Sequence, residues 1–292
     1  MPNLRDIRRK IEAIKKIGQI TRAMNMVAAA KLRGAQTRLE KFRPYGEKFR
    51  EVIAELVASG AVLPSQFPLM ETREVRTVGL VLVTADRGLC GAFNTNLIKE
   101  AEKFIAERER EGQSVKLICV GKKGYQYFRR RAEVLEGYTD VMGRVLMQDA
   151  RTIARRTMRA FLDGEIDEAH VIYGYFINVV RQIPKREKLL PISVEEGPQA
   201  EKTFKGAPIY EPSPEELFEQ ILPMYVNTRI YAAMLETAVS EQAARMTAMD
   251  NANRACGDMV RDLTLLFNKT RQASITKELM DIVGGAEAIK QG

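Results

Sequence analysis

The chain has 292 residues, a net charge of +8 and an ordinary apolar content of 45%, which is enough for one sizeable core with an extension or for two domains. Its longest strongly apolar run, residues 78–83, is far too short to cross a bilayer, and the charged N-terminal residues do not resemble a secretory signal. Cys90, Cys119 and Cys256 at unrelated spacings and a single histidine, His170, argue against a disulfide framework, a zinc site and histidine-based chemistry. We therefore expect a soluble protein of a reducing compartment with no metal and no other cofactor.

Residues 1–58 have the spacing of one long amphipathic helix. Asn3 resembles its N-cap, and an apolar stripe follows at once. Two successive three-residue steps between Ile14 and Ile20 form a stammer, which predicts local overwinding of a supercoil, and Pro44 predicts a kink. The stripe consists of Leu4, Ile7, Ile11, Ile14, Ile17, Ile20, Met24, Val27, Leu32, Ala35, Leu39, Phe42, Phe49, Ile53 and Leu56.

Residues 76–194 change to the pattern of strands alternating with helices. We expect strands at 77–84, 115–120, 168–179 and 182–192, and helices at 95–111, 122–131 and 148–162. Short connections between these elements predict a three-layer, Rossmann-like α/β domain with a mostly parallel sheet and an antiparallel hairpin at its edge. Residues 195–212 are rich in proline, glycine and charge, which indicates a linker or flap.

Residues 213–286 predict a second long helix. Its first residues, Ser-Pro-Glu-Glu at 213–216, combine an N-cap serine, a proline at the first helical position and a capping-box glutamate. Pro223 predicts a kink or break, and Gly284 with Gly285 predicts the end. The apolar stripe steps by four and three residues with one four-four stutter, the repeat of a left-handed coiled coil. It consists of Leu217, Ile221, Met224, Thr228, Tyr231, Leu235, Val239, Gln242, Met246, Met249, Asn253, Cys256, Val260, Leu263, Phe267, Thr270 and Ser274.

The two long helices carry charge of opposite sign. Residues 1–50 have a net charge of +10 and residues 213–292 one of −3, which favours an antiparallel two-helix coiled coil with a shared seam. If Leu56 lies level with Ser213, equal rise places Asn3 level with residue 266. Residues 267–285 would then project as a single helix by about 28 Å. Because this helix carries apolar side chains, we expect it to occupy a socket in another protein.

Polar and small residues in the predicted seam allow two interpretations. Gln242 and Asn253 could set the register of the coiled coil. The alanines near them, with those at 28–30 on the first helix, could instead form a thin shaft that passes through a narrow opening.

The loop from Thr84 to Asn94 follows a predicted strand and precedes a predicted helix, where a dinucleotide-binding fold holds phosphate. Its glycines are three residues apart, which is not the G-x-G-x-x-G spacing, and the frame of a P-loop is absent from the chain. We therefore expect a tight turn in which Asp86 and Arg87 form ion pairs or contact a partner.

The residues alone are compatible with two other functions. The basic first helix could bind nucleic acid, although its cations surround an apolar stripe and no aromatic residue precedes Phe42. A Rossmann-type enzyme is the weaker alternative, because the glycine spacing does not fit.

Six segments of the chain resemble the γ subunits of F-type ATP synthases, and together they extend over nearly its whole length. The matches at 240–249 and at 268–279 with 282–285 are highly specific. The segments are DIRRKI at 6–11, ITRAMNMVAAAK at 20–31, DRGLCGAFN at 86–94, SEQAARMTAM at 240–249, NKTRQASITKEL at 268–279 and IVGG at 282–285.

This resemblance implies a non-catalytic rotor shaft. The coiled coil would stand inside a ring of three α and three β subunits, and the α/β domain would engage the ε subunit and the c ring of the membrane sector. Rotation of the ring and shaft would drive the catalytic β subunits through their conformations. The chain would bind no nucleic acid and insert into no membrane, and it would lie peripherally on the cytoplasmic face of a bacterial plasma membrane.

The resemblance also implies roles for individual residues. Met24 and Arg245 would lie near a lever region of the β subunit. Arg271 and Gln272 would hydrogen-bond a catch loop of that subunit, with Thr276 and Asp281 in the same coupling region. The foot, on the side of the ε subunit and the c ring, would contain Asp86, Arg87, Gly88, Leu89, Cys90, Gly91 and Asn94.

Overall fold

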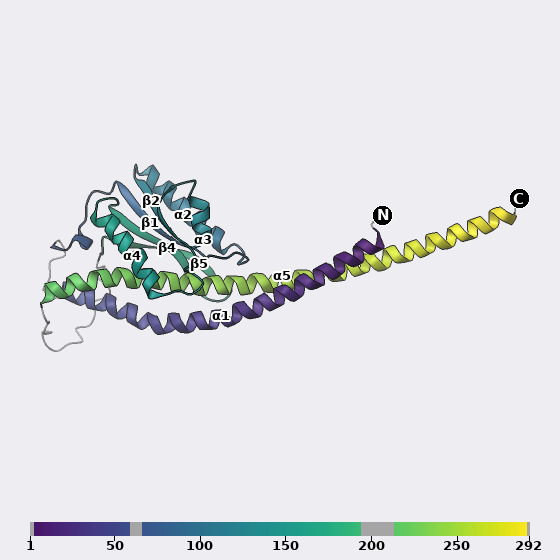
Figure 1. Ribbon diagram of the computed structural model, residues 1–292, viewed down its shortest axis with the longest axis horizontal. Coiled ribbons are helices and arrows are strands. Elements are labelled where there is room, and N and C mark those ends of the chain that lie inside the picture. Colours follow the sequence, from purple (N-terminus) through teal and green to yellow (C-terminus); the bar gives the residue numbers. More distant parts are fainter. Residues whose placement is uncertain (1–2, 59–65, 194–212, 291–292) are drawn as a thin grey trace. The chain divides into compact units, whose positions relative to one another are not determined.

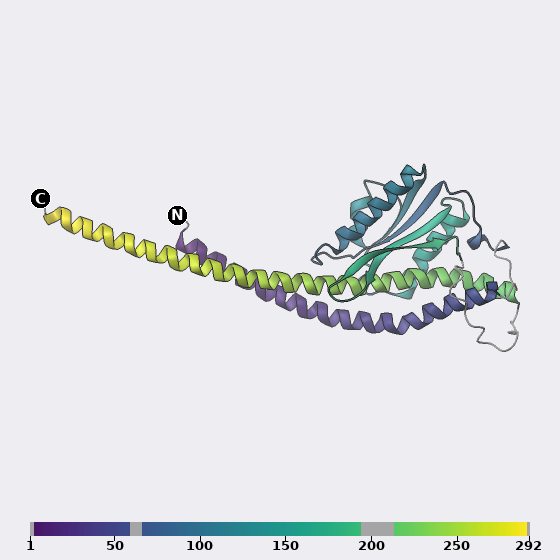
Figure 2. The ribbon, with the colours of Figure 1, turned by 180° about the vertical axis from the view of Figure 1, so that it is seen from behind.

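A computed structural model describes residues 3–58, 66–193 and 213–290 (Figures 1 and 2). Its contacts divide the chain into two compact units, namely residues 29–245, here called the main unit, and residues 1–28 with 246–292, here called the terminal pair. The elements in chain order are α1 (Leu4–Ala58), the 3₁₀ helix η2 (Pro68–Met70), β1 (Thr77–Val83), α2 (Phe93–Arg110), β2 (Ser114–Val120), α3 (Lys122–Phe128), β3 (Glu133–Tyr138), α4 (Met147–Leu162), β4 (Glu168–Phe176), β5 (Gln182–Leu190) and α5 (Pro214–Lys290).

The main unit contains a five-stranded sheet in the order β3-β2-β1-β4-β5. All neighbours are parallel except β4 and β5, which pair antiparallel. This confirms the predicted Rossmann-like α/β fold and its edge hairpin. The prediction missed β3, whose sequence EVLEGY is half-exposed and carries two glutamates and a glycine, so its strand signal is weak.

The sheet is covered on both faces, as a mostly parallel sheet requires. Side chains of α2 and α3, among them Phe104 and Phe128, pack with Leu80 and Leu82 of β1 in one apolar cluster. Figure 1 shows α4 on the opposite face. On that face a Cβ at Gly79 would lie only 2.5 Å from Cδ1 of Ile166, so the sheet there is tightly packed. Across the described residues, no helix has the length and apolar character needed to cross a membrane.

In the main unit α5 lies between α1 and the sheet, as Figures 1 and 2 show. The rings of Phe42 and Tyr231 meet edge to face with centroids 4.8 Å apart, and the backbone of Gly46 lies against Thr228. Helix α5 is therefore buried on two sides here, with Leu235 and Val239 almost fully covered.

In the terminal pair the two helices run antiparallel with Gly18 against Cys256, and Asn25 Nδ2 donates to Met246 O at 2.8 Å. The predicted stammer is wrong. The side chains of Ile17, Ile20 and Val27 are 51%, 59% and 56% exposed. A series of buried or partly buried positions steps by three and four without interruption, with Met24 partly buried beside it; the series is Leu4, Ile7, Ile11, Ile14, Gly18, Thr21, Asn25 and Ala28.

The end of α5 extends beyond its partner. The fifteen residues from Gly18 back to Asn3 correspond to fifteen forward from Cys256, so α1 begins level with about residue 271. Beyond this level Ile275, Leu279 and Ile282 are 49%, 58% and 68% exposed. The single-helix end of α5 therefore begins about five residues later than the sequence predicted.

Helix-breaking residues do not end the long helices. Pro44 lies inside α1 and Pro223 inside α5, and neither helix is broken there. The predicted end at Gly284 and Gly285 is also wrong, because α5 continues to Lys290. A glycine weakens a helix by about 1 kcal/mol but does not by itself terminate it. The predicted start is confirmed, since Ser213 Oγ accepts a hydrogen bond from Glu216 N at 3.2 Å.

Candidate functional site

The joint between α5 and the sheet is the most heavily hydrogen-bonded contact of the long helix. Gly174 N donates to Thr237 Oγ1 at 3.2 Å, Ser240 Oγ donates to Gly174 O at 3.0 Å, and Phe176 N donates to Glu236 Oε2 at 3.1 Å. All three helix side chains are buried. We call this contact the α5–β4 joint.

The sheet itself explains why this end of β4 needs the helix. The pairing of β1 with β4 ends at Ile172, so backbone groups of β4 beyond Ile172 have no strand partner on that side. Buried backbone groups without a partner are destabilising, and the side chains of α5 supply the missing bonds. The helix can approach because the strand has a glycine here. A Cβ at Gly174 would lie 2.6 Å from the ring of Phe93 and 3.4 Å from Cβ of Ser240.

Glu236 also links the joint to α1. Its Oε1 accepts a hydrogen bond from Nη2 of Arg43 at 3.1 Å, while Oε2 binds Phe176 N. One buried carboxylate therefore holds α1, α5 and β4 together, with its charge compensated by a guanidinium and a backbone N–H. This ion pair agrees with the predicted attraction between a basic first helix and an acidic second one.

A second polar contact joins α5 to the hairpin. Tyr173 of β4 donates to Glu187 Oε1 at 2.8 Å, and Arg229 of α5 donates to Glu187 Oε2. Burial would raise the pKa of Glu187, but Arg229 and Lys185 hold that pKa below its usual range. The carboxylate stays charged between these cations, so the sheet edge is fixed to α5 at two places.

The loop of residues 84–94 is held by the carboxylate of Asp86. This carboxylate accepts hydrogen bonds from Lys122 N at 2.9 Å, Asp140 N at 2.9 Å and Met142 N at 2.8 Å. The carboxylate therefore ties the loop to the N-terminus of α3 and to the residues that follow β3. Within the described residues neither Asp86 nor Arg87 forms an ion pair, and the alternative of a contact with a partner stays a prediction.

The other end of this loop is fixed by Asn94 and Arg245. Asn94 Oδ1 accepts from Ala85 N at 2.9 Å, and its Nδ2 donates to Cys90 Sγ at 3.2 Å and Arg87 O at 3.4 Å. Nη2 of Arg245 on α5 donates to Gly88 O at 3.1 Å. The predicted foot residues are therefore brought together, and the loop they form is fastened to the long helix.

Arg245 itself is almost enclosed. Its guanidinium donates to Glu241 Oε1 at 2.5 Å, one helical turn earlier, and its side chain is 10% exposed. Burial raises the pKa of Glu241, although the charge of Arg245 opposes this shift. The pair therefore acts inside the main unit, between α5 and the loop.

The remaining predicted contact residues lie on the terminal pair. Arg271, Gln272, Thr276 and Asp281 are exposed; Arg271 lies about level with the start of α1, and the other three lie beyond it. Thr276 Oγ1 donates to Gln272 O at 2.9 Å within the helix, so the side chains of the other three are available to a partner. Met24 of α1 is only partly buried and precedes Asn25, which binds Met246 O. The structure brings four of these residues together and places Met24 and Arg245 elsewhere.

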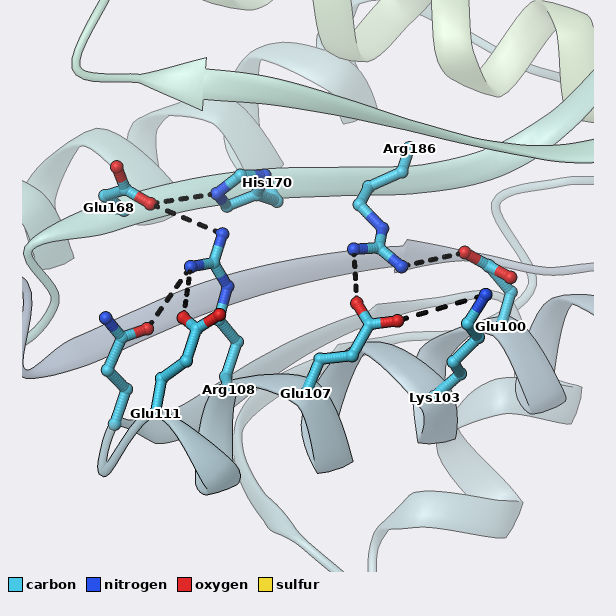
Figure 3. A network of polar contacts seen from close by, with 9 residues as sticks. Glu100, Lys103, Glu107, Arg108, Glu111, Glu168, His170 and Arg186 are labelled. Atoms are coloured by element: carbon cyan, nitrogen blue, oxygen red, sulfur yellow. Dashed lines mark hydrogen bonds and ion pairs between the residues drawn. The ribbon is translucent and has the colours of Figure 1, made fainter.

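A polar network ties α2 to the hairpin strands β4 and β5 (Figure 3). From β5, Arg186 donates to Glu100 at 3.0 Å and to Glu107 at 2.8 Å on α2. Its guanidinium also lies 4.8 Å from the ring centroid of Phe104. The carboxylate of Glu107 has a lowered pKa because it accepts this hydrogen bond.

The single histidine belongs to the same network. His170 of β4 lies against Phe104, with ring centroids 5.1 Å apart, and its Nε2 is 3.1 Å from Glu168 Oε2. Burial lowers the pKa of His170, while the neighbouring carboxylate of Glu168 acts in the opposite direction. His170 is therefore a packed residue of β4, with 7% of its surface exposed. No group of three potential metal ligands occurs within the residues that the structure describes.

The sequence interpretation missed the residues of the α5–β4 joint. Glu236, Thr237 and Ser240 lie on the face of α5 opposite its apolar seam, where polar residues normally indicate solvent exposure. Two signals could have found them. Gly174 interrupts a β-rich run, which indicates close approach of another backbone or helix, and Thr237 with Ser240 are small polar residues one turn apart.

Comparison with known proteins gives consistent matches over the whole chain. The family model described as ATP synthase matches residues 3–289. A protein of Desulfotalea psychrophila named ATP synthase gamma chain is 52% identical over 99% of this chain and 100% of its own length. One of the same name from Syntrophobacter fumaroxidans is 52% identical over 100% of both chains.

Solved structures agree with this match. A chain from the central stalk and c ring of the Tetrahymena thermophila mitochondrial ATP synthase is 25% identical, with a TM-score of 0.60 over 80% of this chain and 99% of its own. A chain from the Euglena gracilis mitochondrial ATP synthase is 20% identical, with a TM-score of 0.66 over 98% of this chain and 94% of its own. The latter likeness concerns the fold alone.

Proposed function

Because the chain belongs to the ATP synthase family as a gamma chain, the rotor subunit of the central stalk, we propose that the α5–β4 joint transmits rotation between the α/β domain and the long helices. The chain itself contributes no catalytic group. It would act by contacting the β subunits differently in their different conformations, which biases those conformations without chemistry of its own.

The observation that carries this proposal is the set of buried hydrogen bonds from Glu236, Thr237 and Ser240 to β4. A rotor needs its shaft fixed to the part that is turned. Loose packing between a helix and a sheet would allow slip, whereas directional bonds at buried positions fix one arrangement. Residues 1–58 and 213–286 would form the shaft, and residues 76–194 would form the domain that is turned.

The partners we propose are the α and β subunits around the shaft, and the ε subunit and c ring at the α/β domain. The Tetrahymena chain comes from a structure of central stalk and c ring, which supports the second group. The exposed apolar end of α5 supports a socket in the α and β subunits. We also propose a peripheral location on the cytoplasmic face of a bacterial plasma membrane, since the relatives above are bacterial gamma chains.

Contacts with the β subunits would come from Arg271, Gln272, Thr276 and Asp281, with Met24 nearer the other end of the shaft. Arg245 was predicted to be one of these contacts. Its guanidinium already binds Glu241 and Gly88, so a partner could reach only the exposed edge of that side chain.

The test uses the assembled complex. Arg271→Ala with Gln272→Ala should leave assembly intact and weaken ATP-driven proton pumping by about tenfold, because two hydrogen-bonding side chains are worth about 1–3 kcal/mol together. The control is Glu109→Ala with Arg110→Ala, two exposed residues of α2. Unchanged pumping in the first double variant would contradict the assigned contacts. Failure of the unmodified chain to co-purify with α and β subunits would contradict the function.

A further inference from the structure

A small cavity lies where α1, α4 and α5 meet in the main unit. Its volume is about 190 Å³, and it is lined by Tyr45 of α1, Met147 and Arg151 of α4, and Met224, Asn227 and Thr228 of α5. Tyr45 and Met224 are exposed to solvent, so a small solute can enter. None of the six residues belongs to the α5–β4 joint or to the loop of residues 84–94, so the cavity is a separate feature of the main unit.

The cavity collects hydrogen-bond donors that the protein itself does not use. Four of the lining side chains carry a donor, and within the described residues none of the four has a hydrogen-bonding or ion-pair partner; they are Tyr45, Arg151, Asn227 and Thr228. Thr228 is only 3% exposed, and its Cγ2 faces Gly46 of α1, which leaves its hydroxyl to the cavity. A buried hydroxyl without a partner is destabilising. These four donors are therefore available to an acceptor from outside the chain.

The electrostatic surroundings of the cavity favour an anion. No carboxylate is among the described residues that line it. Residues three or four positions apart share one face of a helix, and at these distances from the lining residues there is no Asp or Glu on the three helices, whereas Lys41 and Arg155 occur there. No side chain caps the first turn of α4, which begins at Met147, so its free N–H groups and the positive end of the helix dipole lie at the same wall. Asp149 of that turn is two residues from both Met147 and Arg151, and it therefore faces away from the cavity.

We propose that this cavity binds one inorganic phosphate ion, which links α4 to α1 and α5. A guanidinium such as that of Arg151 binds a phosphate through two parallel hydrogen bonds, and the hydroxyl and amide groups of the wall supply donors for its other oxygens. Free N–H groups at the start of a helix are a further common element of phosphate sites. The cavity is smaller than the range of about 300–1,000 Å³ for pockets that hold drug-sized ligands, which excludes burial of a whole nucleotide. Binding requires only the folded chain, so it does not depend on the proposed function.

The test is a calorimetric titration of the purified full chain with inorganic phosphate in about 0.15 M KCl, which screens non-specific attraction to a cationic protein. We expect one site per chain with a Kd of about 1 mM or lower. Arg151→Gln should raise this Kd at least about tenfold. The matched control is Arg155→Gln, which removes the same charge one turn further along α4 from a residue outside the cavity and should change the Kd less than about twofold. Equal effects of the two variants, or no saturable binding, would overturn the proposal.

Thr228→Val and a second anion test the cavity and the ligand separately. Valine nearly preserves the volume of threonine, so this variant should raise the Kd for phosphate at least about fivefold. It should leave the melting temperature of the phosphate-free chain unchanged or higher, because the hydroxyl that it removes has no partner there. An unchanged Kd would refute the role of the cavity. Acetate should bind at least about tenfold more weakly than phosphate, and equal affinity for acetate would overturn the assignment of phosphate as the ligand.

Discussion

The α5–β4 joint gives the sharpest prediction about the free chain. Thr237→Val with Ser240→Ala nearly preserves side-chain volume and removes both partners of Gly174. Its N–H and its carbonyl would then be buried without those hydrogen bonds, and each such loss is worth about 1–3 kcal/mol. Because the two sites are adjacent and not fully additive, we expect the free energy of local opening to fall by about 2–5 kcal/mol.

Two measurements check this value. Amide hydrogen exchange at Gly174 reports local opening, and a loss of about 1.4 kcal/mol speeds exchange tenfold, so an acceleration of at least about 30-fold is expected. The urea midpoint of the purified chain should fall as well. The control is Thr264→Val, which removes an exposed hydroxyl on α5 that donates to Val260 O at 2.7 Å and should change little. If Gly174 exchanges in the double variant as it does in the control, the joint does not hold the helix.

Three further predictions concern other parts of the main unit. His170→Gln should reduce the loss of stability between pH 7 and pH 5. Burial lowers the pKa of His170 in the folded chain, so the unfolded chain takes up the proton first, and the stability of the wild type falls below pH about 6.5. Urea titrations at both pH values that show the same loss for the variant and the wild type would be evidence against this. Gly121→Ala should destabilise the chain by more than about 3 kcal/mol, since the new Cβ would lie 2.1 Å from Thr84 O at a φ of +93°. Gly34 is a helical site with open space around it, so Gly34→Ala should stabilise the chain by up to about 1 kcal/mol. Thermal melts that rank the two variants the other way would be incompatible with the packing described. Leu89→Gly should raise stability by about 0.5–1 kcal/mol. Leu89 has a φ of +61°, and relief of about 1–2 kcal/mol of left-handed strain exceeds the added backbone entropy of glycine. A lower melting temperature would show that Leu89 is not strained.

The long coiled coil could be predicted because its seam repeats over many turns. Positions such as Met249 and Cys256 are buried as the four-three spacing requires. The same reasoning failed at Ile17 and Ile20, where it followed the most apolar residues. Helix packing instead selected Gly18 and Thr21, because the partner helix needs regular spacing and close approach more than it needs large side chains.

Another error comes from tertiary contacts. Proline removes one backbone hydrogen bond from a helix and costs about 3 kcal/mol, which predicted a kink or a break at Pro223, and α5 is not broken there. Phe218, Leu222 and Val226 on the same segment are almost fully buried, and their burial, at about 1.5–3 kcal/mol each, outweighs that loss. Tertiary contacts of this kind are invisible in the local sequence.

The candidate site was predictable only where a motif was compact. The residues of the 84–94 loop were recognised as a group, and the structure brings them together around Asp86. Their attachment to Arg245 and the joint at Gly174 depend on contacts between residues more than sixty positions apart. No spacing rule along the chain reports such contacts.

The central claim is that this chain turns as a shaft that is fixed to its α/β domain. The direct measurement is the rotation of a fluorescent probe on the α/β domain. The probe is attached to a cysteine that replaces Lys103, an exposed residue of α2, in complexes immobilised through the α and β subunits. With ATP supplied, the probe should turn in one direction and pause at three positions per turn, one for each β subunit. A probe that stays stationary while ATP is hydrolysed would contradict the account.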